Sequence, residues 1–195
     1  MTQRNVAILI FDEVEVLDFA GPFEVFSVTR TERESPFQVY TVAETLAPVL
    51  ARNGLSINPK HTLSDCPAPH IVVIPGGYGS RRAMHQESIL KWVKIHVHTV
   101  ELMLSVCTGS LILAQAGLLE GLSATTHHHA YEELRQISST INVIENQRFI
   151  DTGKIITSAG ISAGIDMSLY VVAKLLGQAQ AETTAGYMEY DWPRS

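Results

Sequence analysis

Residues 101–110, ELMLSVCTGS, form the stretch that decides the fold. Residues 101–106 are a mainly apolar run of strand length, which is typical of a strand buried on both faces of a parallel sheet. Cys107 follows at once, and residues 111–116 continue as a predicted helix that ends at Gly117. A buried strand that turns directly into a helix is the repeating unit of α/β folds, so this stretch predicts that class and places Cys107 at the turn.

Outside this stretch, strand-like and helix-like segments alternate from one end of the chain to the other. Further strands are predicted over residues 6–11, 37–43, 71–74 and 122–125, with hairpins around residues 52–54 and 151–153. Helices are predicted over residues 19–26, 89–100, 131–137, 161–176 and 179–188. We therefore expect one domain, residues 1–195, with a flavodoxin-like, doubly wound and mostly parallel sheet that carries helices on both faces.

The first predicted helix carries an aromatic stripe. Phe19, Phe23 and Phe26 follow the spacing i, i+4 and i+7, which puts them on one helix face. Pro22 falls in the first turns of this predicted helix, where proline is tolerated. An exposed apolar helix gains from being covered by a second copy, so we expect a homodimer.

The composition narrows the class of protein. Of the 195 residues, 46 % are apolar and 17 % are charged, which is the composition of a folded chain. The net charge is −6 and there is no run of basic residues, so nucleic acid is not an expected partner. Apolar runs shorter than ~18 residues and the absence of a signal-like N-terminus predict a cytoplasmic protein that binds no membrane.

Cys107 is the main candidate for chemistry. Ser105 stands two residues before it and Gly109 two residues after it, a partial match to the elbow that presents a nucleophile between a strand and a helix. A thiol at a helix N-terminus is stabilised as the thiolate. The alternative is an inert core cysteine. Cys66 lacks such a setting and is interpreted as structural, and two cysteines make no disulfide framework.

Two further segments follow predicted strands and face the same edge of the sheet. Gly76 and Gly77 belong to the loop PGGYG, whose backbone N–H groups could form an oxyanion site or an ordinary turn. Asp18 follows the first strand and is either a partner of the cysteine or a helix cap. Ligands of doubly wound sheets bind at the carboxyl ends of the strands, so these residues and Cys107 are expected to gather there.

Three consecutive histidines, His127, His128 and His129, follow the predicted strand 122–125. Neighbouring residues of an extended chain point to opposite faces, so the three rings cannot easily share one tetrahedral metal site. We therefore expect no metal. His127 is the candidate for a role beside Cys107, either catalytic or structural.

Five segments together resemble the ThiJ/PfpI superfamily, which has the class I glutamine-amidotransferase-like fold. They are LDFAGPFEVF (17–26), VVIPGG (72–77), VCTGS (106–110), ATTH (124–127) and TSAGISAGID (157–166). The combination of LDFAGP, VCTGS and ATTH is similar to the isonitrile hydratase branch. The same pattern occurs in domains of AraC-type regulators, but the chain ends at Ser195 without room for a DNA-binding appendix, so we expect an enzyme.

The resemblance implies a role for each candidate. Cys107 is the nucleophile, Asp18 is the carboxyl beside it, and Thr108 takes the place where the protease-like branch has histidine. The backbone N–H groups of Gly76, Gly77 and Thr108 are implied as the oxyanion and substrate-binding site. The implied reaction is hydration of a small-molecule isonitrile to an N-substituted formamide, without a metal or organic cofactor.

Two alternatives remain open. His127 is shared with relatives that act on α-oxoaldehydes or glycated groups, so a glyoxalase- or deglycase-like enzyme is the second hypothesis. A non-catalytic redox sensor or binding domain that uses oxidation of Cys107 is the third. For the enzyme we expect a protonated Asp18 that donates to a Cys107 thiolate, with the pKa of the thiol below the ~8.5 of a free cysteine.

Overall fold

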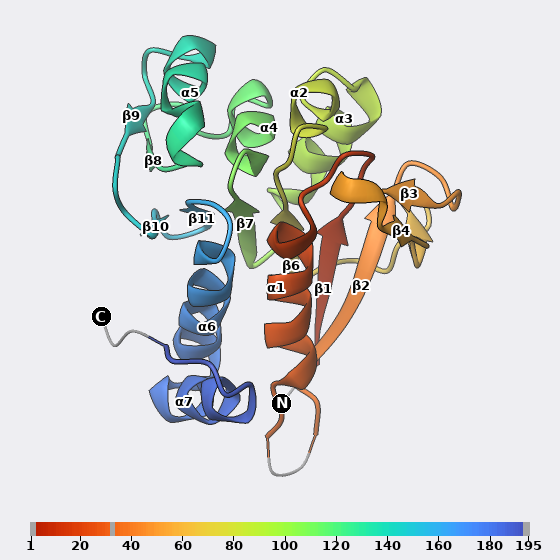
Figure 1. Ribbon diagram of the computed structural model, residues 1–195, viewed down its shortest axis with the longest axis vertical. Helices are drawn as coiled ribbons and strands as arrows, with labels where there is room; N and C mark the ends of the chain where they lie inside the picture. Colours follow the sequence, from red (N-terminus) through yellow and green to blue (C-terminus); the bar gives the residue numbers. More distant parts are fainter. Residues whose placement is uncertain (1–2, 32–33, 193–195) are drawn as a thin grey trace.

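The structure is a computed structural model that describes residues 3–31 and 34–192, and it is built around one twisted central sheet (Figure 1). Seven strands in the described part of the chain pair in the order β10-β11-β7-β6-β1-β2-β5. Their bounds are β1 (Arg4–Leu9), β2 (Phe37–Ala43), β5 (His61–Thr62), β6 (Ile71–Ile74), β7 (Leu102–Val106), β10 (Phe149–Asp151) and β11 (Ile155–Ser158). Every pair is parallel except β10–β11 at one edge. The expected doubly wound, mostly parallel sheet is confirmed.

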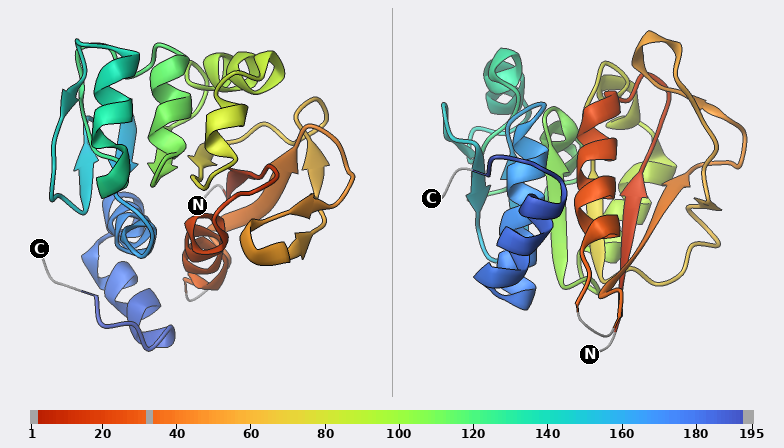
Figure 2. Two further views of the ribbon diagram at one scale, coloured as in Figure 1. Left: turned by 45° about the horizontal axis from the view of Figure 1, so that its top comes forward. Right: turned by 60° about the horizontal axis from the view of Figure 1, so that its bottom comes forward.

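Helices cover both faces of this sheet, as Figure 2 shows in its left view. One face carries α1 (Val16–Val28), α6 (Ala163–Leu176) and α7 (Gln178–Tyr187). The other carries α2 (Ser80–Ala83), α3 (Glu87–His96), α4 (Gly109–Gln115) and α5 (Tyr131–Ile137). All side chains of β6 and β7 are buried between these layers, which explains why both strands are apolar runs without alternation.

Short elements complete the chain. The strands β3 (Val49–Leu50) and β4 (Ser56–Ile57) form the expected hairpin around the turn η1 (Arg52–Gly54). The hairpin around residues 151–153 is confirmed by the antiparallel pair β10–β11. The predicted strand 122–125 is shorter and lies outside the central sheet, because β8 (Ser123–Ala124) pairs only with β9 (Asn142–Val143). The turn η2 (His128–Ala130) follows it.

The first helix differs from its prediction in two ways. It begins at Val16, so Pro22 is its seventh residue and lies in the helix interior rather than in the first turns. Phe19 and Phe26 are buried against the chain's own core, and only Phe23 reaches the surface, with 36 % of its area exposed. Most of the aromatic stripe is therefore buried within one chain, so the stripe alone does not support a homodimer.

The strand order places a topological switch at β1. The chain passes from β1 to β2 on one side, and β6 then pairs with β1 on the other side. Because the connections after β1 and β6 run to opposite sides of the sheet, a crevice forms between them at the carboxyl ends of these strands. The segments that follow β1, β6 and β7 meet at this edge. No helix among the described residues is both long and apolar enough to cross a membrane.

Candidate active site

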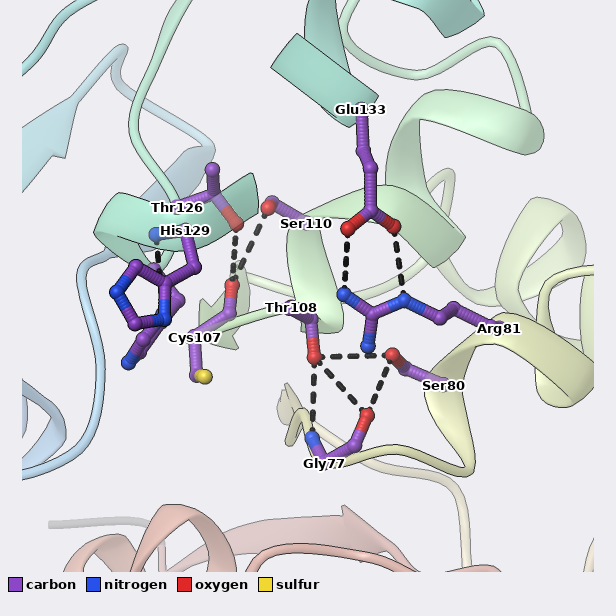
Figure 3. Close-up of polar contacts among 10 residues, drawn as sticks. Gly77, Ser80, Arg81, Cys107, Thr108, Ser110, Thr126, His129 and Glu133 are labelled. Carbon is purple, nitrogen blue, oxygen red and sulfur yellow. Dashed lines mark hydrogen bonds and ion pairs between the residues drawn. The ribbon is translucent and has the colours of Figure 1, made fainter. Parts of the chain in front are cut away.

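Cys107 lies at a sharp backbone elbow between β7 and α4. Its φ angle is +56°, in the left-handed region that a side chain other than glycine rarely adopts, and only 6 % of its area is exposed. Its N–H donates to the Ser158 carbonyl at 3.1 Å, and its carbonyl accepts from the hydroxyls of Ser110 at 3.2 Å and Thr126 at 3.0 Å (Figure 3). Backbone strain held in place from both sides is a frequent feature of functional sites.

Gly160 packs directly against the thiol. A Cβ atom at this position would lie 2.8 Å from the Cys107 sulfur and 2.6 Å from Cδ2 of His127. Only glycine leaves this space free, and the same measurement shows that the thiol and the His127 ring border one small volume. Gly160 stands inside the segment TSAGISAGID, but no pattern in the sequence distinguished it as a site residue.

Asp18 is completely buried beside the cysteine. It is the third residue of α1, and the N-cap of that helix is Glu15, so Asp18 does not act as a helix cap. Its Oδ2 accepts the Gly76 N–H at 3.1 Å, whereas Oδ1 has no hydrogen-bond partner within the described residues. Burial raises the pKa of Asp18 to about 7, although the Cys107 thiol and the Gly76 N–H partly offset this by stabilising the carboxylate.

The pKa of the Cys107 thiol is shifted in the opposite direction to the one that the sequence predicted. Burial raises the pKa of the thiol above its usual value, and the Asp18 carboxylate facing it raises the pKa further. The Thr108 N–H stabilises the thiolate but does not outweigh these effects, and α4 is only seven residues long. Both shifts disfavour two negative charges side by side, so the pair holds at least one proton near neutral pH. The expected lowering of the thiol pKa is therefore contradicted, whereas the raised pKa of Asp18 has the direction expected for a protonated carboxyl.

Thr108 is the centre of a buried hydrogen-bond network that links two loops. Its Oγ1 accepts the Gly77 N–H at 3.0 Å and donates to the Gly77 carbonyl at 3.2 Å (Figure 3). The Ser80 hydroxyl lies 2.8 Å from the Gly77 carbonyl and 2.9 Å from Thr108 Oγ1. The N–H groups of Gly76 and Gly77, expected to bind an oxyanion, thus have protein partners, and the Thr108 N–H is the one directed at the sulfur.

The three histidines do not form an extended segment. His128 and His129 belong to the turn η2, and His127 caps it by accepting the His129 N–H on Nδ1 at 3.2 Å. The turn gathers the rings, whose centroids lie 4.0 to 5.2 Å apart. The extended conformation assumed for these three residues is therefore wrong. Burial lowers the pKa of His127, with further lowering by its two neighbours and by Arg81, so its ring is neutral.

A cavity of about 370 Å³ opens beside the Cys107 thiol. Arg52 stacks on the exposed Tyr78 ring at 3.7 Å and lies 3.9 Å from the Glu15 carboxylate. Arg81 forms two hydrogen bonds with Glu133, at 2.8 and 2.6 Å (Figure 3). The remaining lining residues are Gly77, Cys107, Thr108, the three histidines and Ile161. The volume suits a small organic molecule, and both arginines that line it are paired with carboxylates.

The parallel sheet, the elbow cysteine and the buried carboxyl beside it define a class of α/β proteins with a cysteine-centred site at the switch point of the sheet. Residues 4–174 match the DJ-1/PfpI family, and the chain belongs to that family. It is 35 % identical to an isonitrile hydratase of Pseudomonas putida over 186 residues, which cover 95 % of this chain and 78 % of the relative.

Other relatives share the fold but are named for different roles. The HTH-type transcriptional regulator CdhR of Pseudomonas aeruginosa is 28 % identical, over 87 % of this chain and 50 % of the regulator. A crystal structure of a ThiJ/PfpI family protein from Pseudomonas syringae superposes with a TM-score of 0.88 at 33 % identity, and covers all of this chain and 78 % of that one. Drosophila melanogaster DJ-1beta, with a TM-score of 0.84 and 18 % identity over 98 % of this chain and 100 % of that one, shows the fold alone.

Proposed function

We propose that this protein is a cysteine-dependent hydratase that converts isonitriles to N-substituted formamides. The observation that carries the proposal is the buried pair of Cys107 and Asp18, in which the thiol lines a small-molecule cavity and a carboxyl with a pKa of about 7 faces it. The 35 % identity with an isonitrile hydratase over nearly the whole chain supports the same substrate class.

In the first half of the proposed reaction, Asp18 relays a proton. The carboxylate removes the thiol proton while the Cys107 sulfur bonds to the terminal carbon of R–N≡C. The protonated Asp18 then delivers the same proton to that carbon. The product is a thioimidate, R–N=CH–S–Cys107, and Asp18 returns to the carboxylate. This order fits a pair in which the pKa of the thiol is raised and the Asp18 carboxylate faces it.

Water completes the reaction in the second half. Asp18 takes a proton from a water molecule that adds to the thioimidate carbon and passes it to the imidate nitrogen, which gives R–NH–CH(OH)–S–Cys107. The C–S bond then breaks as the hydroxyl proton passes through Asp18 to the sulfur, so the formamide R–NH–CHO leaves and the thiol is restored. The Thr108 N–H stabilises the departing sulfur. Because Nδ1 of neutral His127 accepts the His129 N–H, its hydrogen is on Nε2, and we assign this N–H to bind the substrate.

The proposed reaction needs no metal or organic cofactor. The binding partner that we propose for the protein is a small-molecule substrate, and the proposed location of the protein is the cytoplasm. We also propose a homodimer, which now rests on three exposed apolar residues instead of the whole aromatic stripe. Leu17, Phe23 and Ile161 are the exposed large apolar residues of α1 and of the loop before α6. Sedimentation at micromolar concentration tests this, and a species of monomer mass would contradict it.

Turnover measured with two substrates separates the three hypotheses. Hydration of cyclohexyl isocyanide without conversion of methylglyoxal supports the proposal, and the reverse result supports a glyoxalase- or deglycase-like enzyme. Absence of both reactions, together with ready oxidation of Cys107 to the sulfinic acid, supports a redox sensor. The variant Cys66→Ser is the matched control, because Cys66 lies away from the cavity and is expected to leave turnover unchanged.

A further inference from the structure

The histidine turn at the cavity wall offers three imidazoles to one point. One ligand nitrogen from each of His127, His128 and His129 can be chosen so that all three lie within 4.8 Å of one another. Nitrogen ligands of a tetrahedral zinc ion, at about 2.0–2.1 Å from the metal, lie about 3.3 Å apart. His128 and His129 are exposed and make ring contacts but no side-chain hydrogen bond within the described residues, so rotation of their side chains can close the difference.

From this geometry we propose that His127, His128 and His129 form a binding site for a borderline divalent transition-metal ion such as Zn²⁺, with water as the fourth ligand. Imidazole suits zinc, copper and nickel, and three protein ligands with one open position is a common zinc arrangement. The expectation of no metal rested on an extended chain. The turn removes that objection, and the proposed site does not depend on the proposed hydratase activity.

The local charges and hydrogen bonds permit a cation. The guanidinium of Arg81, which lines the same cavity, is held in a two-point pair by Glu133, so it does not face the histidines as an uncompensated charge. Metal binding through Nε2 of His127 would place the ring hydrogen on Nδ1, so Nδ1 would give up the His129 N–H that it accepts at 3.2 Å, and water can solvate that exposed N–H.

The position of the cluster links metal binding to access to the thiol. All three histidines line the same cavity as Cys107, and His127 and the sulfur border the same space at Gly160. A hydrated ion held by the three rings would therefore occupy the cavity beside the thiol. Bound metal is expected to slow the reaction of Cys107 with any reagent that enters from this side.

Isothermal titration of the untagged chain with Zn²⁺ tests the site directly. We expect one ion per chain with a micromolar or lower dissociation constant, weakened at least tenfold in His128→Gln and in His129→Gln. His98→Gln, which replaces an exposed histidine in the turn after α3, is the matched control and should bind like the wild type. Cys107→Ala should also retain the affinity, because sulfur is not a proposed ligand.

Three results of the titration would contradict the proposed zinc site. Absence of zinc binding at millimolar concentration, or equal affinity in the wild type and in both cavity-histidine variants, overturns the site. Loss of affinity in Cys107→Ala assigns the ion to the cysteine and also contradicts it. As a second readout, saturating Zn²⁺ should slow alkylation of Cys107 by iodoacetamide at least fivefold in the wild type and not in His128→Gln. An unchanged rate in the wild type contradicts the placement of the ion in the cavity.

Discussion

The Gly76 N–H donates to Oδ2 of Asp18 at 3.1 Å and fixes a fully buried carboxyl beside the elbow cysteine. This single bond ties the loop after β6 to the helix after β1. It leaves Oδ1 free of protein hydrogen bonds among the described residues, so this oxygen is the one available to exchange a proton.

The first prediction concerns the pH dependence of turnover. The proposed relay starts from the Asp18 carboxylate and the Cys107 thiol. The Asp18 pKa of about 7 therefore sets the rising limb, and kcat/KM should increase from about pH 5.5 to about pH 8 and then level off. Initial rates of cyclohexyl isocyanide hydration across this range provide the measurement. A kcat/KM that falls as pH rises through 7 would assign Asp18 the role of a protonated acid instead.

The second prediction concerns stability and needs no substrate. The folded pKa of Asp18, about 7, lies above its unfolded value of 3.8, so the folded protein binds more protons between these values. Stability from this group is present at low pH and is lost as pH rises through about 7. Between about pH 5 and about pH 8 the wild type should lose about 2 to 3 kcal/mol of unfolding free energy relative to Asp18→Asn.

Urea denaturation of both proteins at the two pH values measures this difference. Glu24→Gln, on the exposed face of the same helix, is the control and should follow the wild type at both values. A constant difference between the wild type and Asp18→Asn would mean that the buried carboxyl titrates near its ordinary value.

The third prediction concerns Gly160. A methyl group in Gly160→Ala would collide with both the Cys107 sulfur and the His127 ring, so turnover should fall at least a hundredfold. Gly186→Ala is the matched control, because a Cβ there meets no atom within 4 Å and should leave turnover unchanged. Thermal unfolding checks that Gly160→Ala remains folded. Near-normal activity in a folded Gly160→Ala would show that this space beside the thiol is not used.

The fourth prediction concerns Thr108. The variant Thr108→Val loses the hydroxyl that pairs with Gly77 and Ser80, and leaves buried polar groups without partners at a cost of about 1–3 kcal/mol. Thr108→Ser keeps the hydroxyl and should retain most of the stability and the activity. Denaturation curves and kcat/KM of both variants test this. Equal stability of Thr108→Val and the wild type would mean that the network contributes little to holding the two loops together.

Much of the fold could be predicted because the local signals agree with the tertiary structure. The strands Phe37–Ala43 and Ile71–Ile74 and the helix Tyr131–Ile137 have the predicted bounds. A continuous apolar run between turn residues has few alternatives in a parallel sheet. The start of α1 was missed, because Pro22 was expected near a helix N-terminus although this helix accommodates it in its interior.

The candidate site was only partly predictable. Asp18 follows β1, and Cys107 and Thr108 follow β7, and these parallel strands flank β6 in the sheet, so the three residues meet at one edge, which a sequence pattern can indicate. The direction of the Cys107 pKa depends on burial and on the orientation of one carboxylate, and both are tertiary properties. The role of Gly160 depends on an approach between segments about fifty residues apart, which leaves no local signature.

The central claim is that Cys107 forms a covalent bond to the isonitrile carbon, and mass spectrometry of the rapidly quenched reaction tests it most directly. The wild type mixed with cyclohexyl isocyanide should gain the mass of one isonitrile, and peptide mapping should place the addition on Cys107. The adduct should be absent in Cys107→Ala, which should stay folded and lose turnover, and present in Cys66→Ser. A Cys107→Ala variant that still hydrates the substrate at more than a few per cent of the wild-type rate would contradict the account.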